Sequence, residues 1–195
     1  MLSSPSSPVR SALLLLLLAG CAHPPPPVPS EIPPPPVVQV PAALRTALSG
    51  TWVYAGGQAE LAQVDPAVEH ATAEMGFLAR GFAAEALRAR ARPRDRYTVA
   101  LEGTTVTISS PEDPVERGDL GGPPVTVTDR FGDENQTTFE LRDGALVEAG
   151  KSKDGSGETV FVPSADGRSL LVHRTMRSGK LSAPLELVYS YRRQD

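Results

Sequence analysis

The feature that most constrains this fold is a run of alternating apolar and polar residues, from Arg96 to Tyr191, that is punctuated by evenly spaced turns. Four turn pairs follow one another at steps of about a dozen residues: Asp143-Gly144, Asp154-Gly155, Asp166-Gly167 and Ser178-Gly179. Strands joined so closely pair in antiparallel order, and a long meander closes on itself because open edges invite aggregation. The pattern predicts an all-β protein, an antiparallel up-and-down β-barrel of about nine strands.

The same alternation predicts which side chains share a strand face. These apolar sets are Tyr97, Val99 and Leu101; Val106 and Ile108; Val125 and Val127; Phe139 and Leu141; Val160 and Val162; Leu170 and Val172; and Leu185, Leu187, Tyr189 and Tyr191. The acidic pairs Glu112-Asp113 and Asp133-Glu134 fall in loop-like sequence between strands. We expect these carboxylates to be solvated.

The segment before the meander has a different period. A short helix is expected over 42–48, followed by a first strand, 49–54, that contains the only tryptophan. Asp65 and Pro66 are typical of a helix start. One helical face then carries Val68, Ala71, Met75, Leu78 and Phe82. Gly76 and Gly81 are expected to divide the segment into two helices, the second over 83–92.

This order of elements resembles the calycin superfamily, and within it the fatty-acid-binding-protein-like barrels. The residues that carry the resemblance are Gly50-Thr51-Trp52, the stretch 75–80, the hairpin 98–108 and the ending Leu187-Val188-Tyr189. The resemblance implies that the helix pair forms a lid over a cavity. It also implies a carboxylate site on the last strand, made by arginine and tyrosine two residues apart. Here Leu187 stands in the arginine position and Tyr189 alone matches; Arg174 and Arg192 are the candidates to replace the arginine.

The first twenty residues predict an export signal. Arg10 precedes an apolar run, Leu13–Leu18, that is too short to span a bilayer core of roughly 30 Å. Leu18-Ala19-Gly20-Cys21 resembles the lipobox of bacterial lipoproteins, which implies removal of residues 1–20 and acylation of Cys21. The same resemblance, with Ala22 after the cysteine, implies a lipid-anchored protein of the outer membrane that faces the periplasm. The alternative is an ordinary signal peptide with an incidental cysteine.

Residues 21–43 predict a tether. Ten of the twenty prolines of the chain lie between 24 and 41, and proline fixes φ and disfavours helix before it. Such sequence forms polyproline II, and roughly 20 residues at about 3.1 Å each span about 60 Å. We expect a stalk that carries a barrel domain over 44–195; the alternative is a docking peptide for an SH3-like partner.

No catalytic or metal-binding constellation is found in the sequence. His23 lies in the tether, and His70 and His173 have no partner at metal-ligand spacing, so we expect both domain histidines at the surface. The segment 153–158 has the glycines and acids of a calcium loop, but Pro163 occupies the position of the bidentate glutamate, which favours a hairpin turn. We therefore expect no enzyme, no metal and no cofactor.

The remaining charge pattern leaves two interpretations open. Alternate residues from 88 to 96 are arginine, which suits either a solvated helix end or a contact with anionic headgroups. A net charge of −4 argues against nucleic acid as a partner.

These observations favour a lipoprotein whose barrel binds a small apolar ligand, a lipid or fatty acid. The alternative is an envelope protein whose barrel is filled by its own side chains and which acts through a protein partner. The expected ligand contacts are Met75, Phe77, Leu78, Phe82, Tyr189 and Arg174.

Overall fold

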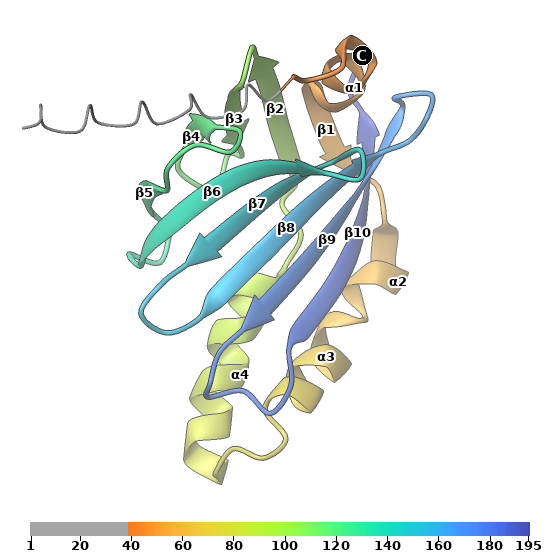
Figure 1. Ribbon diagram of the computed structural model, residues 1–195. Coiled ribbons are helices and arrows are strands. Elements are labelled where there is room, and N and C mark those ends of the chain that lie inside the picture. The colour runs from red at the N-terminus through yellow and green to blue at the C-terminus, as the bar shows by residue number, and fades with distance from the viewer. Residues whose placement is uncertain (1–38) are drawn as a thin grey trace, which may run out of the picture. The chain divides into compact units, whose positions relative to one another are not determined.

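A computed structural model describes residues 39–195 of the chain. Four helices come early: α1 (Ala42–Leu48), α2 (Gly57–Leu61), α3 (Val64–Ala71) and α4 (Phe77–Ala91) (Figure 1). The strands are β1 (Gly50–Tyr54), β2 (Arg96–Glu102), β3 (Thr105–Ser109), β4 (Glu116–Asp119), β5 (Val125–Thr128), β6 (Glu134–Arg142), β7 (Ala145–Lys151), β8 (Ser156–Pro163), β9 (Ser169–Arg177) and β10 (Leu185–Arg193). Residues 1–38, with Cys21 and most of the tether, lie outside the described part. No helix within residues 39–195 is long and apolar enough to cross a bilayer.

The strands form one antiparallel sheet in the order β4-β3-β2-β1-β10-β9-β8-β7-β6-β5. From β1 to β4 and from β5 to β10, each strand pairs with its neighbour in sequence, and β1 also pairs with β10, so the first and last strands lie side by side. β4 and β5 end the order and do not form a ladder with each other. β4 instead passes close to β6 at Gly118, where an added Cβ would lie 2.9 Å from the Phe139 ring. The up-and-down barrel predicted from the sequence is confirmed, nearly closed rather than fully hydrogen-bonded.

The sheet has ten strands rather than the predicted nine or so. β4 was not predicted because its sequence has no apolar alternation. Its sequence, Glu-Arg-Gly-Asp, reads as a charged loop, but its backbone pairs with β3 from Ile108↔Glu116 to Thr105↔Asp119. The predicted turn between β6 and β7 is present: Asp143 (φ 52°) and Gly144 (φ 79°) are both left-handed, which suits a two-residue hairpin. The calcium-like segment is also a hairpin, with the Ser152 N–H donating to the Gly155 carbonyl over 2.9 Å.

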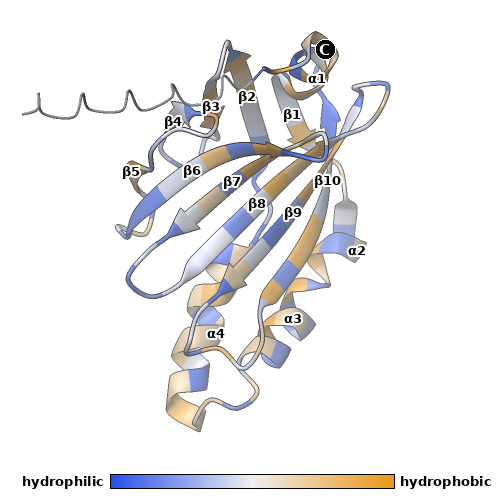
Figure 2. Ribbon diagram, in the orientation of Figure 1, coloured by the Kyte–Doolittle hydropathy of each residue, from blue (hydrophilic) through white to orange (hydrophobic). Residues whose placement is uncertain are grey.

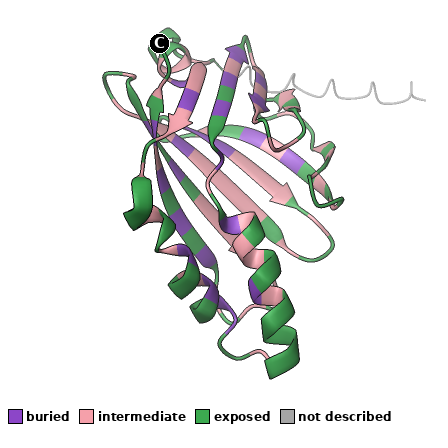
Figure 3. Cartoon of the chain, turned by 180° about the vertical axis from the view of Figure 1, so that it is seen from behind, coloured by how far each residue is buried: buried purple, intermediate pink, exposed green. Residues whose placement is uncertain are grey.

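The apolar residues predicted to share one helical face lie on two helices, α3 and α4, and do not share a face. α3 ends at Ala71, and residues 72–76 separate it from α4, so the phase of the apolar face changes between the two helices. Val68 on α3 is therefore buried, while Leu78 and Phe82 on α4 are 75% and 77% exposed. Gly81 lies inside α4 and does not interrupt it. Figure 3 shows that α4 presents a largely exposed outer side, with α3 next to it.

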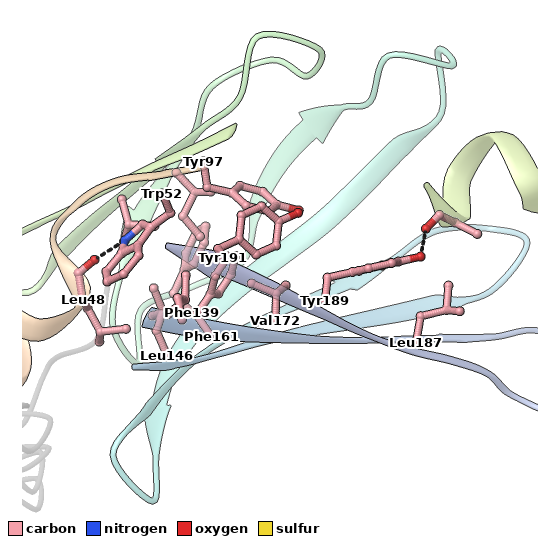
Figure 4. Close-up of a cluster of buried hydrophobic side chains, with 14 of the residues drawn as sticks. Leu48, Trp52, Tyr97, Phe139, Leu146, Phe161, Val172, Leu187, Tyr189 and Tyr191 are labelled. Atoms are coloured by element: carbon pink, nitrogen blue, oxygen red, sulfur yellow. Dashed lines mark hydrogen bonds between the residues drawn. The ribbon is translucent and has the colours of Figure 1, made fainter. Parts of the chain in front are cut away.

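One end of the barrel is filled with side chains (Figure 4). Trp52 is fully buried there, and its indole N–H donates to the Leu48 carbonyl over 3.0 Å. Tyr97 packs on Phe161 and Tyr191, with ring centroids 5.3 Å apart in both pairs. The inward residue of β8 is Phe161; the prediction of Val160 and Val162 was wrong, because the ladder places Phe161 between Leu146 and Val172 of the neighbouring strands. The other predicted strand faces of β2, β3, β9 and β10 are buried as expected.

Arg193 fastens the end of α1 to the end of the chain. Its guanidinium lies over the Trp52 ring, 4.4 Å from the ring centroid. It donates to the carbonyls of Ser49 (2.6 Å), Ala47 (2.8 Å) and Gly167 (2.6 Å). Carbonyls at the C-terminus of a helix have no partner within the helix, and a cation is favourable there. One side chain therefore joins α1, β10 and the β8–β9 turn.

Replacing Arg193 with methionine is expected to lower the free energy of unfolding by about 2 kcal/mol, since methionine keeps the packing on Trp52 but loses every donor. Urea denaturation monitored by far-UV circular dichroism measures the change. Arg192→Met is the matched control, because Arg192 is exposed on the opposite face of β10 and its loss should change stability by less than about 0.5 kcal/mol. Equal effects of the two substitutions would contradict the role given to Arg193.

Candidate functional site

The other half of the barrel contains a cavity of about 470 Å³ that is partly open to solvent. α4 forms one wall through Ala83, Ala86, Leu87 and Arg90, which recur at helical spacing. Opposite α4, the cavity is bounded by inward positions of the sheet, including Glu148 and Gly150 on β7. Figure 2 shows the change along β6, which is hydrophilic where it begins and carries apolar residues towards the filled end. The cavity thus has both apolar and polar walls.

The apolar part of the wall comes from both the helical segment and the sheet: Met75, Ala83, Leu87, Ile108, Phe131 and Met176. This surface suits the body of a small apolar molecule, since ligand pockets of roughly 300–1,000 Å³ are lined mainly by such side chains with a few polar groups. The filled end of the barrel closes the cavity on one side, so a ligand would enter from the end that α4 covers.

Two glutamates with no basic partner face the cavity. Glu116 on β4 and Glu148 on β7 both line it, and neither forms a salt bridge in the part of the chain that the structure describes. The Oε2 atom of Glu116 is shielded from solvent and accepts no hydrogen bond from a protein donor. Burial, with repulsion from Glu148, raises the pKa of Glu116 to about 8. Burial raises the pKa of Glu148 to about 7, against the attraction of Arg174.

Glu116 and Glu148 lie close enough for the charge of each to oppose ionisation of the other. Two adjacent carboxyl groups of this kind titrate as a pair, because ionising the second is opposed by the charge of the first. Near neutral pH, the pair therefore retains at least one proton.

The arginines around the cavity are held by other groups. Arg94 forms a salt bridge with Asp113, and Arg90 binds both Asp129 (2.6 Å) and Asp133 (2.5 Å). Arg174 donates to the carbonyls of Arg90 (3.0 Å) and Arg92 (3.3 Å), at the C-terminal end of α4. Of the arginine run 88–96, Arg90 and Arg94 are held by loops of the barrel and Arg88 by Asp65 of α3, whereas Arg92 and Arg96 are exposed to solvent. The expectation of solvated acidic pairs was wrong for Asp113 and Asp133, which hold these arginines.

Of the side chains predicted to contact a ligand, two line the cavity: Met75 and Arg174. Phe77, Leu78 and Phe82 lie on the outer side of α4 and are 89%, 75% and 77% exposed. The structure therefore brings together only part of the predicted set, because α4 turns its apolar N-terminal residues away from the barrel.

Tyr189 is buried and does not line the cavity. Its hydroxyl donates to the Ala91 carbonyl, and burial raises the pKa of Tyr189 to about 12. Tyr191 makes a similar bond to the Arg94 carbonyl over 3.0 Å. Both tyrosines of the last strand thus fix the end of α4 and the segment after it to the barrel (Figure 4).

Neither Glu116 nor Glu148 was predicted from the sequence as a site residue. Glu148 occupies an inward position of β7, two residues after buried Leu146, and this spacing is the one signal that could have found it. Glu116 had no such signal because β4 was not predicted.

Glu148→Gln is expected to raise the free energy of unfolding by about 1–3 kcal/mol at pH 8 and to leave it nearly unchanged at pH 5. The pKa of each glutamate is raised in the folded protein, so the folded state binds more protons than the unfolded state between about pH 4.5 and pH 8. The free energy of unfolding therefore falls as pH rises through that range. Glutamine at position 148 removes one of the two groups that must ionise while buried. Urea denaturation at both pH values measures the change in the free energy of unfolding, with exposed Glu186→Gln as the control. An equal effect at pH 5 and pH 8 would count against the carboxyl pair.

No protein-family model and no curated protein matches the chain. Solved structures do match, at low identity. The REP1-NXSQ fatty acid transporter is 15% identical, over 75% of this chain and 96% of that one, with a TM-score of 0.46. A Schistosoma mansoni fatty acid binding protein in complex with arachidonic acid is 11% identical over 78% and 99%, with a TM-score of 0.47. A zebrafish ileal bile acid-binding protein complexed with cholic acid is 13% identical over 76% and 99%, also at 0.47.

Among residues 39–195, no group of three or more histidine, cysteine, aspartate or glutamate side chains is arranged to hold a metal ion. His70 and His173 are both exposed, as predicted. With likenesses this distant, what the chain binds has to be inferred from its own cavity.

Proposed function

We propose that this protein is a binding protein, not an enzyme, and that it holds a small amphipathic molecule inside the barrel. The observation that carries the proposal is the cavity of about 470 Å³ with an apolar wall beneath α4. A barrel filled throughout by its own side chains would have no such space. The apolar body of the ligand would lie against Leu87, Ile108 and Met176, and its polar head would reach Glu116 and Glu148.

We further propose that the barrel is anchored to the outer membrane through acylated Cys21 and works in the periplasm. The support is the run of leucines followed by Leu18-Ala19-Gly20-Cys21. Each buried methylene contributes about 0.8 kcal/mol, so several acyl chains hold a protein far more firmly than one. The proline-rich stretch behind the cysteine would act as the stalk.

A protein partner is the second candidate function, and one observation favours it. Phe77, Leu78 and Phe82 make an exposed apolar surface on α4 that the barrel does not use. Such surfaces on a small domain often mark interaction sites. This role would be compatible with ligand binding, since the surface and the cavity lie on opposite sides of α4.

Native mass spectrometry of the protein purified from its own envelope tests the binding proposal. We expect a co-purifying molecule of small mass that is released on unfolding. A protein of unliganded mass that also takes up no added amphiphile would overturn the proposal.

The anchor is tested separately by Cys21→Ser. This variant should lose its acyl chains and leave the membrane fraction. If it still fractionated with membranes, the lipid anchor would be refuted, whatever the cavity binds.

A further inference from the structure

The side chains that line the cavity include more acidic than basic groups. The basic side chains that line it are Arg90, Arg94, Arg174, Arg177 and Lys180. Arg90, Arg94 and Lys180 each form a salt bridge with an aspartate, and Arg174 is occupied by backbone carbonyls. The acidic side chains that line the cavity outnumber the basic ones, and Glu116 and Glu148 form no salt bridge within residues 39–195, although the charge of Arg174 attracts both.

Burying a carboxylate without a partner costs several kcal/mol, so such groups take up a proton or pair with a cation. In the ligand-free barrel, a proton retained by the pair serves this purpose. Glu116 retains one oxygen that is shielded from solvent and has no donor. A donor-rich, positively charged group placed between the two carboxyls would satisfy both of them better than one proton does.

Building on the proposed function, we infer that the cavity selects an amphiphile whose polar head is a protonated amine, held between Glu116 and Glu148. The apolar walls would take its hydrocarbon body. This is the opposite of a carboxylate site: a ligand carboxylate would meet two acidic groups, and the two arginines nearest the pair, Arg94 and Arg174, already have acceptors. Tyr189, the one residue that matches the carboxylate site of the resembled family, donates its hydroxyl to the Ala91 carbonyl instead.

The groups that surround the pair set its response to pH. They come from four strands and two loops: Tyr97 on β2, Arg174 on β9, the two glutamates on β4 and β7, Arg94 in the α4–β2 loop and Asp113 in the β3–β4 loop. Arg94 and Arg174 favour the ionised pair, whereas Asp113 and burial oppose it. Binding of an ammonium head expels a proton from the pair to solvent, so its affinity must rise with pH while the pair is still protonated.

Three ligands of equal chain length test the inference: decylamine, decanol and decanoic acid. Each is titrated calorimetrically into the mature chain, residues 21–195 carrying Cys21→Ser, at pH 6 and pH 8. An alkylammonium ion keeps its charge over this range, as a lysine side chain does. We expect decylamine to bind at least tenfold more tightly than the other two at pH 8, and its affinity to rise about tenfold or more from pH 6 to pH 8.

The double variant Glu116→Gln/Glu148→Gln should lose this preference and this pH dependence while still binding decanol. Circular dichroism confirms that it is folded, and Glu148→Gln alone gives a milder form of the same test. If decanoic acid bound as tightly as decylamine, or if the double variant kept its preference for the amine, the inference would be overturned and the proposed function would stand. If none of the three bound the native chain, the proposed function itself would fail, and the inference with it.

Discussion

Replacing Trp52 with alanine is expected to lower the free energy of unfolding by roughly 3–5 kcal/mol, a large part of the stability of a domain this size. Trp52 is completely buried at the filled end of the barrel, beneath Arg193 and next to α1. Alanine would leave a void and would free the Leu48 carbonyl, which now accepts the indole N–H. Urea denaturation followed by far-UV circular dichroism measures the loss.

Leu171→Ala is the control for this experiment. Leu171 lies on the outer face of β9 and is 43% exposed, so its truncation should cost less than about 1 kcal/mol. A loss below about 1 kcal/mol for Trp52→Ala would show that the filled end contributes little to stability, contrary to the packing described above.

Gly150→Phe is expected to abolish ligand binding, with at least a tenfold loss of affinity for any amphiphile the barrel takes up. Gly150 lies on the inner face of β7, two residues after Glu148, and lines the cavity. An added Cβ would meet only Thr137 and Asn135, at 3.9 and 4.0 Å, so the phenyl ring has room to enter the cavity. Stability should be unchanged or higher, because phenylalanine is a better strand residue than glycine.

The matched control for Gly150→Phe is Lys151→Phe, the same ring placed one residue later on the outer face of the same strand. Decylamine titration and thermal unfolding of both variants separate blocking from unfolding. If Gly150→Phe remained folded and bound decylamine as the native chain does, the ligand would have to lie somewhere other than this cavity.

The sequence predicted the architecture well because the barrel follows from two local signals. Alternating residues set the strand faces, and glycine-containing pairs such as Asp143-Gly144 set the turns. β8 was assigned the wrong face because Val160, Phe161 and Val162 are all apolar, so alternation there has no phase. The ladder decides it by placing Phe161 between two inward neighbours.

The site was predicted only in part, for reasons of packing. The apolar residues of α4 were assigned to the cavity because Phe77, Leu78 and Phe82 are large and apolar. The break after α3 turns them outward, and smaller residues such as Ala83 face the barrel instead. Glu116 and Glu148 are 32 positions apart in sequence numbering and meet only when the barrel closes. No local pattern connects them.

The most direct test of ligand binding inside the barrel is a two-dimensional NMR titration of the mature Cys21→Ser chain with decylamine. Binding inside the barrel should shift the amide signals of cavity positions such as Leu87, Glu148, Gly150 and Met176, with little change at Phe77, Leu78 and Phe82. Shifts confined to the exposed residues of α4, with the cavity positions unmoved, would contradict it.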